Sequence, residues 1–217
     1  MQWIYSVFTA ALVTGACYGM LYRSDSVYQL ELRKKGNWIT DKAVFGIVGL
    51  TFIGTLAVGK LRLLLLEMPS ALLLAVLLWG MAVLAVIDGK RKLIPNRFLL
   101  GLLMVWATVT GCLLIIHTES GLRLLFSSLA GALIGGAVFL LCYILSRGQM
   151  GAGDVKLACI MGLYLTGDRI LGAVFYGTLL CCIYSLVQLF RKKLTLKNGV
   201  PMTPFLYMGT LLILLMQ

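Results

Sequence analysis

The stretch MPSALLLAVLLWGMAVLAVI, from Met68 to Ile87, contains no charged side chain. A helix of about twenty apolar residues crosses the hydrocarbon core of a bilayer. The whole chain shares this character, since 60% of its 217 residues are hydrophobic and only 12% are charged. This composition excludes a water-soluble globule and a disordered chain, and the continuous apolar runs exclude a transmembrane β-barrel, whose strands alternate. It predicts an all-α, polytopic membrane protein.

The chain divides into apolar segments that predict about eight transmembrane helices in a single membrane-embedded domain, residues 1–217. The segments cover residues 3–22, 43–59, 68–87, 98–116, 122–146, 155–166, 169–190 and 204–216. The sixth is short for a full crossing, so we expect a half-span or a tilted helix packed against its neighbours. Gly131 and Gly135 in the fifth have the spacing that lets helix backbones approach closely in lipid.

Lysine and arginine are distributed unevenly over the loops between these segments. Alternate loops, beginning with residues 23–42, hold most of the 19 basic residues. Cytoplasmic loops carry the excess of basic residues in membrane proteins. We therefore predict a short cytoplasmic loop at 23–42 and both termini outside. The net charge of +11 is then a topology signal and does not indicate a nucleic-acid partner.

Two of the eight acidic residues stand apart from the loop charges. Asp88 ends the third apolar segment, and Asp154 follows Gly151-Ala152-Gly153 at the start of the sixth, so both are predicted at the cytoplasmic membrane boundary. Taken alone, Asp88 fits an ordinary turn and Asp154 fits a helix N-cap. Glycine at 151 and 153 removes Cβ clashes and allows positive φ, so this loop can approach another segment closely.

Two facing carboxylates have a well-defined chemistry. Like charges a few ångströms apart do not both ionise readily, so the pair shares a proton. The ionised member draws a proton from water while the protonated member polarises a scissile carbonyl, without a metal or cofactor. Hydrolysis through histidine or zinc is poorly supported, because the one histidine, His117, is predicted on the opposite side of the membrane. The six cysteines form no C-x-x-C pair.

Three stretches, in this order along the chain, resemble motifs of the type IV prepilin peptidases, a family of GxGD membrane aspartic proteases. Asp88 with Leu93-Ile94-Pro95-Asn96 resembles the D-x(5–6)-I-P-N stretch of that family. Gly151-Ala152-Gly153-Asp154-Val155-Lys156-Leu157 matches its G-x-G-D-x-K-L signature, and Pro201-Met202-Thr203-Pro204-Phe205-Leu206 is similar to its I-P-F-G-P-F-L segment, with two substitutions. The resemblance implies a GxGD aspartic protease architecture with Asp88 and Asp154 as the catalytic pair. It makes Gly151, Gly153, Lys156, Pro95, Asn96 and Pro204 supporting motif positions.

The resemblance further implies an endopeptidase of the cytoplasmic membrane that removes the short basic leader of type IV prepilins or pseudopilins at the cytoplasmic face. It implies no cofactor. Long members of the family carry two C-x-x-C pairs in the loop after the first span and also N-methylate the new terminus. Loop 23–42 contains no cysteine, so we expect no zinc, and the difference argues against N-methyltransferase activity.

Two alternatives to a peptidase stay open. One is a small transporter or channel in which the carboxylates relay protons or cations, which favours acidic residues near the bilayer midplane. The other is a pilus-assembly scaffold without activity, against which the presence of both aspartates counts.

Overall fold

The computed structural model describes residues 68–91, 93–146, 150–191 and 200–216, and this part of the chain consists of α-helices without strands. The helices are α3 (Met68–Arg91), α4 (Asn96–Ile116), α5 (Thr118–Leu145), α6 (Ala152–Phe190) and α7 (Thr203–Met216). The prediction of an all-α membrane protein is confirmed. The first two predicted segments and loop 23–42 lie outside the described residues, so the count of eight spans and the single domain stay predictions.

Four of the described helices are long and apolar enough to cross a membrane, namely α3, α4, α5 and α6. α7 is equally apolar but has only 14 residues. The predicted segments at 68–87, 98–116, 122–146 and 204–216 correspond to α3, α4, α5 and α7. The sixth and seventh predicted segments both fall within α6. The path of the chain between these two segments therefore depends on the shape of α6.

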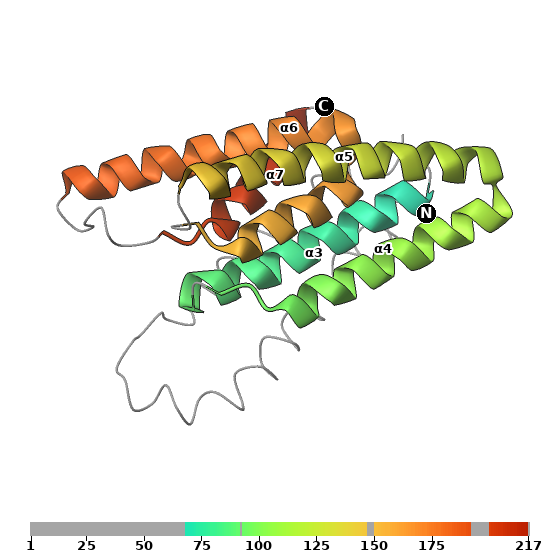
Figure 1. The fold of residues 1–217 in the computed structure, drawn as a ribbon, viewed down its shortest axis with the longest axis horizontal. Coiled ribbons are helices and arrows are strands. Elements are labelled where there is room, and N and C mark those ends of the chain that lie inside the picture. The colour runs from blue at the N-terminus through green and yellow to red at the C-terminus, as the bar shows by residue number, and fades with distance from the viewer. Residues whose placement is uncertain (1–67, 92, 147–149, 192–199, 217) are drawn as a thin grey trace, which may run out of the picture.

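α6 consists of two helices joined at a sharp bend. Thr166 has φ 65° and ψ 175°, a backbone conformation that β-branched residues rarely adopt, and it separates residues 152–165 from residues 167–190. Asp154 and Cys181 interact electrostatically, although a straight helix would place them about 40 Å apart. The chain therefore reverses at Thr166, and the second half of α6 runs back past the first (Figure 1).

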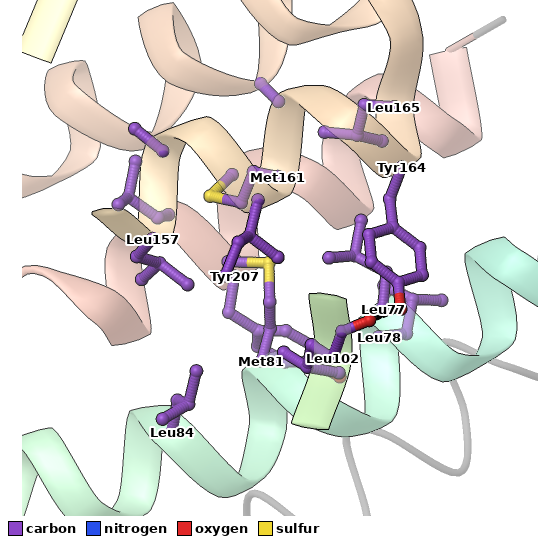
Figure 2. Close-up of a cluster of buried hydrophobic side chains, with 14 of the residues drawn as sticks. Leu77, Leu78, Met81, Leu84, Leu102, Leu157, Met161, Tyr164, Leu165 and Tyr207 are labelled. Atoms are coloured by element: carbon purple, nitrogen blue, oxygen red, sulfur yellow. Dashed lines mark hydrogen bonds between the residues drawn. The ribbon is translucent and has the colours of Figure 1, made fainter. Parts of the chain in front are cut away.

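The first half of α6 lies inside the bundle. Leu157, Met161 and Leu165 are fully buried, and they cluster with Met81 of α3 and Tyr207 of α7 (Figure 2). A helix that is apolar all round is expected to be enclosed by other elements. About 14 residues of helix extend only about 21 Å, less than the hydrocarbon thickness. The sixth segment is thus a short, enclosed helix packed against its neighbours, as its length predicted.

One buried hydrogen bond joins this enclosed half of α6 to α4. The hydroxyl of Tyr164 donates to the carbonyl oxygen of Leu102 at 2.6 Å, and Tyr164 is 3% exposed. A phenol in an apolar interior needs a partner, because an unpaired hydroxyl loses the hydrogen bonds it makes in water. The bond therefore fixes α4 against α6, and with it the position of the start of α4.

Glycines bring the backbones of α5 and α6 into direct contact. A Cβ atom on Gly131 would collide with the carbonyl oxygen of Gly162, and one on Gly162 would collide with Gly131. A Cβ on Gly135 would lie 2.8 Å from the carbonyl oxygen of Ala158, again a backbone atom. The close approach predicted from the Gly131–Gly135 spacing is confirmed, and it is what encloses the first half of α6.

α7 is held by the same kind of contact and by one side-chain bond. A Cβ on Gly209 would collide with the backbone of Ala173 and Gly177 in the second half of α6. On the side facing α3, the Thr210 hydroxyl lies 3.6 Å from the Met81 sulfur. α7 is therefore wedged between α3 and α6, which determines where its N-terminus lies.

We predict that Gly131→Ala destabilises the protein by about 2–3 kcal/mol, because the new methyl group meets backbone atoms that cannot move aside. Gly101→Ala in α4 is the matched control. Among the described residues, no atom outside its own stretch of helix lies within 4 Å of its added Cβ, so it should be neutral or stabilise by up to about 1 kcal/mol through helix propensity. Thermal unfolding of the purified protein in detergent measures both. Equal stability of the two variants would contradict the assigned packing.

Candidate active site

Four helix ends meet near the predicted site residues. α3 ends at Arg91, α4 begins at Asn96, α6 begins at Ala152 and α7 begins at Thr203. Three of these ends are helix N-termini, where backbone N–H groups lack partners within the helix and favour oxygen acceptors and negative charge. The predicted site residues lie on these four ends, and direct contacts connect them.

Asp88 lies in the last turns of α3 and is 5% exposed. Its Oδ2 atom accepts a 3.0 Å hydrogen bond from the backbone N–H of Thr203, the first residue of α7. That N–H has no carbonyl to reach within α7, whereas the next available donors, on Phe205 and Leu206, both bond to the carbonyl of Met202. A buried carboxylate and an otherwise unpaired amide therefore satisfy each other.

Pro204 occupies the second position of α7. A proline at the start of a helix loses nothing by lacking an N–H, and its ring restricts φ to a helical value. The predicted support residue thus stands directly after Thr203, the residue whose amide holds Asp88.

Asp154 lies in the first turn of α6 and is partly buried. Its carboxylate accepts a hydrogen bond from the backbone of Gly151 and interacts electrostatically with the carboxylate of Asp88. Its own backbone N–H donates to the carbonyl oxygen of Gly151 at 3.0 Å. The two predicted catalytic aspartates, which come from different helices, are therefore neighbours.

Gly151 and Gly153 provide room for close contacts. Gly151 has φ −71° and ψ 132°, an extended conformation open to any residue, so positive φ is not what selects glycine there. A Cβ on Gly151 would lie 3.2 Å from the Asp154 Oδ2 atom, and a Cβ on Gly153 would lie 3.1 Å from the Ile94 Cβ atom. A side chain at either position would crowd the carboxylate or the turn before α4.

The remaining supporting positions, Lys156 and the Pro95-Asn96 turn, contact each other. The Lys156 ammonium donates to the Asn96 side-chain oxygen at 3.1 Å, and both residues are exposed. Pro95 precedes α4 with an extended backbone, and its carbonyl accepts the N–H groups of Phe98 and Leu99. The start of α6 is thereby tied to the start of α4, at the surface beside the paired aspartates.

This arrangement suits proton transfer to and from water. Two adjacent carboxylates, each bonded to a backbone N–H, can divide the roles of acid and base between them. Within the described ranges, no three His, Cys, Asp or Glu side chains are grouped so that they could hold a metal ion. His117 lies between α4 and α5, at the opposite end of α4 from Asn96.

Thr203 is a residue of this site that the sequence motifs did not single out. Pro204 is identical to the family segment that it resembles, whereas Thr203 is one of the two positions that differ from that segment. A threonine in front of a proline at the start of an apolar run is a helix-start signal, but nothing in the sequence connects it with Asp88. That connection exists only because α3 and α7 pack together.

Comparison with known proteins gives two matches. Residues 75–186 match the type IV leader peptidase family, a range that includes both aspartates and ends before α7. A prepilin leader peptidase/N-methyltransferase of Bacillus subtilis (strain 168) is 26% identical over 130 residues, covering 60% of this chain and 50% of the relative. The chain thus spans about half the length of the curated relative it matches. No solved structure matches the chain.

We predict that Asp154→Asn raises the thermal stability at neutral pH, because it removes a partly buried charge that is poorly solvated and also repelled by the carboxylate of Asp88. The gain should be on the order of 1 kcal/mol. Glu119→Gln is the control, since Glu119 is an exposed carboxylate in the first turn of α5, where negative charge is slightly favourable. The unfolding temperature should therefore rise for Asp154→Asn and fall slightly for Glu119→Gln. A loss of stability in Asp154→Asn would contradict the unfavourable surroundings assigned to the Asp154 charge.

Proposed function

The chain belongs to the type IV leader peptidase family, and from this premise we propose that it is a membrane aspartic endopeptidase that cleaves the leader of type IV prepilins or pseudopilins. The observation that carries the proposal is the meeting of Asp88 and Asp154 where α3, α6 and α7 have their ends. Both aspartates lie within the family match. The name of the Bacillus relative, which includes prepilin leader peptidase, supports the substrate class.

The two aspartates share the work of general acid and general base. Oδ2 of Asp88 accepts an amide N–H, which leaves Oδ1 of Asp88 and the carboxylate of Asp154 to exchange protons with the reactants. The ionised carboxylate removes a proton from water, and the protonated one donates a hydrogen bond to the scissile carbonyl oxygen. The hydroxide adds to the carbonyl carbon. The C–N bond then breaks as the nitrogen gains a proton, which leaves a carboxyl group on the leader and a free amine on the pilin.

The proposed substrate enters with its apolar helix in the membrane and its leader on the cytoplasmic side. The site end of the described helices carries more basic residues than the opposite end, namely Lys90, Arg91, Arg97 and Lys156 against Arg123 and Arg169. This asymmetry supports a cytoplasmic position for the site, with both termini outside. Anionic headgroups of the cytoplasmic leaflet would reduce the repulsion between these cations and a basic leader.

The proposal covers peptide-bond hydrolysis and not N-methylation. N-methyltransferase is the second activity in the name of the Bacillus relative, and this chain covers only half the length of that protein. Loop 23–42 lacks the cysteine pairs of the long family members, which supports a peptidase that acts without zinc.

A proton or cation relay is the competing function. Relay carboxylates are expected near the bilayer midplane, often on broken helices. Asp88 lies in the last turns of α3 and Asp154 in the first turn of α6, and the break in α6 at Thr166 lies at the other end of its enclosed half. These positions favour the peptidase.

We predict that Asp88→Asn and Asp154→Asn each abolish leader cleavage, because either change leaves the pair without an acid or a base. The loss should be at least about a thousandfold. Each variant is co-expressed with a candidate prepilin, and cleavage is detected as a mobility shift on a gel.

Glu119→Gln serves as the control, since it removes an exposed carboxylate far from the pair and should process the prepilin as the wild type does. Insertion of each Asn variant in the membrane is verified by its level and its unfolding temperature. Normal processing by either Asn variant would refute the aspartate-pair mechanism.

We also predict that chelators leave cleavage unchanged. Two carboxylates with backbone donors can activate water without a metal. Purified protein is assayed after treatment with EDTA and with a zinc-selective chelator, and metal is then added back. Inhibition by the chelator that is reversed by one metal would contradict the cofactor-free mechanism.

A further inference from the structure

We propose that the side-chain hydroxyl of Thr203 hydrogen-bonds the water molecule that attacks the scissile peptide bond. The inference rests on the proposed peptidase function and adds to it a residue of α7, beyond the range of the family match. Two independent observations support it, namely an unpaired buried hydroxyl and a bond from the same residue to Asp88.

The first observation is that the Thr203 hydroxyl is buried without a partner. Thr203 is 0% exposed, and among the described residues its Oγ1 atom makes no hydrogen bond. A buried hydroxyl without a partner costs about 1–3 kcal/mol. Ser128 also has a buried hydroxyl without a partner, but only Thr203 bonds to the proposed catalytic Asp88. The partner that the proposed reaction brings to Thr203 is water.

The second observation is the location of that hydroxyl. The backbone N–H of Thr203 donates to Oδ2 of Asp88 at 3.0 Å, and the unpartnered hydroxyl is carried by this same residue. Asp154 interacts electrostatically with Asp88 from α6. Two carboxylates and one hydroxyl provide the two to four polar partners that hold an ordered water molecule.

The helix start explains why this hydroxyl is left free. A threonine inside a helix usually donates to the carbonyl four residues earlier. Thr210 of the same helix is also 0% exposed, and it does this with the carbonyl of Leu206 at 2.8 Å. Thr203 is the first residue of α7 and has no preceding helical turn. Its hydroxyl therefore has no backbone acceptor within the helix and keeps its hydrogen-bonding capacity for a partner that enters the site.

Substitutions at position 203 can remove the hydroxyl and still keep the backbone N–H that donates to Asp88. Only proline would remove that N–H. Thr203→Val preserves the shape and removes the hydroxyl. Thr203→Ser keeps the hydroxyl, and Thr203→Gly opens space in which a second water can replace it. Two control variants, Thr210→Val and Ser128→Ala, test other buried hydroxyls, one partnered and one unpartnered.

The experiment measures kcat and KM for cleavage of a purified prepilin, together with the unfolding temperature. Thr203→Val should lower kcat at least about tenfold with KM unchanged, since one hydrogen bond to the reacting water is lost. Its unfolding temperature should stay equal or rise, because an unpaired buried hydroxyl disappears. Thr203→Ser should restore kcat to within about threefold of the wild type, and Thr203→Gly should fall between Ser and Val. The two controls should keep the wild-type kcat.

A Thr203→Val enzyme that cleaves at the wild-type rate, or one whose kcat falls only together with its stability, would overturn the inference. If Thr203→Val does not accumulate, a Thr203→Gly enzyme as fast as Thr203→Ser would overturn it instead. The Asp88→Asn variant is assayed in parallel. Cleavage by Asp88→Asn refutes the proposed peptidase mechanism itself, whereas an inactive Asp88→Asn beside a fully active Thr203→Val refutes only the role of Thr203.

Discussion

The backbone contact between Gly131 of α5 and Gly162 of α6 is the interaction on which the rest of the described structure depends. The first half of α6 is too short to cross a bilayer, so it is stable only when other helices enclose it. Glycine at both positions lets α5 approach at a distance that no side chain permits. The enclosed helix then presents Asp154, in its first turn, to the end of α3 that carries Asp88.

Helix N-termini allow two carboxylates to lie in an apolar protein, because their unpaired N–H groups donate hydrogen bonds to the carboxylate oxygens. Asp88 is buried yet accepts an amide at the start of α7, and Asp154 accepts a backbone bond at the start of α6. Each bond also satisfies an N–H that the helix itself leaves unpaired. Their mutual repulsion remains, and it is the physical property that allows the pair to act as acid and base. The site therefore retains a local instability that serves its chemistry.

The sequence predicted the helices well where hydrophobic length decides them. The segments corresponding to α3, α4, α5 and α7 were recognised because long uncharged runs have few other structures available in lipid. It also predicted two segments within α6, since the polar residues around Asp168 interrupt the apolar pattern. It did not predict that Thr166 adopts a positive φ, because β-branched residues rarely do so. Gly131 of α5 lies against the backbone at this bend, a contact that only the tertiary structure creates.

The sequence predicted some features of the candidate site, and only the tertiary structure revealed the others. Asp88 and Asp154 could be selected from the sequence alone, because acidic residues are rare in this chain and a carboxylate at the edge of an apolar segment needs a chemical reason. Their proximity, the Asn96–Lys156 bond and the part of Thr203 were decided by tertiary structure. Sequence patterns report the environment of each residue along its own helix. Which helix ends meet is set by contacts between residues far apart in the chain, and here by the few glycines that let backbones touch.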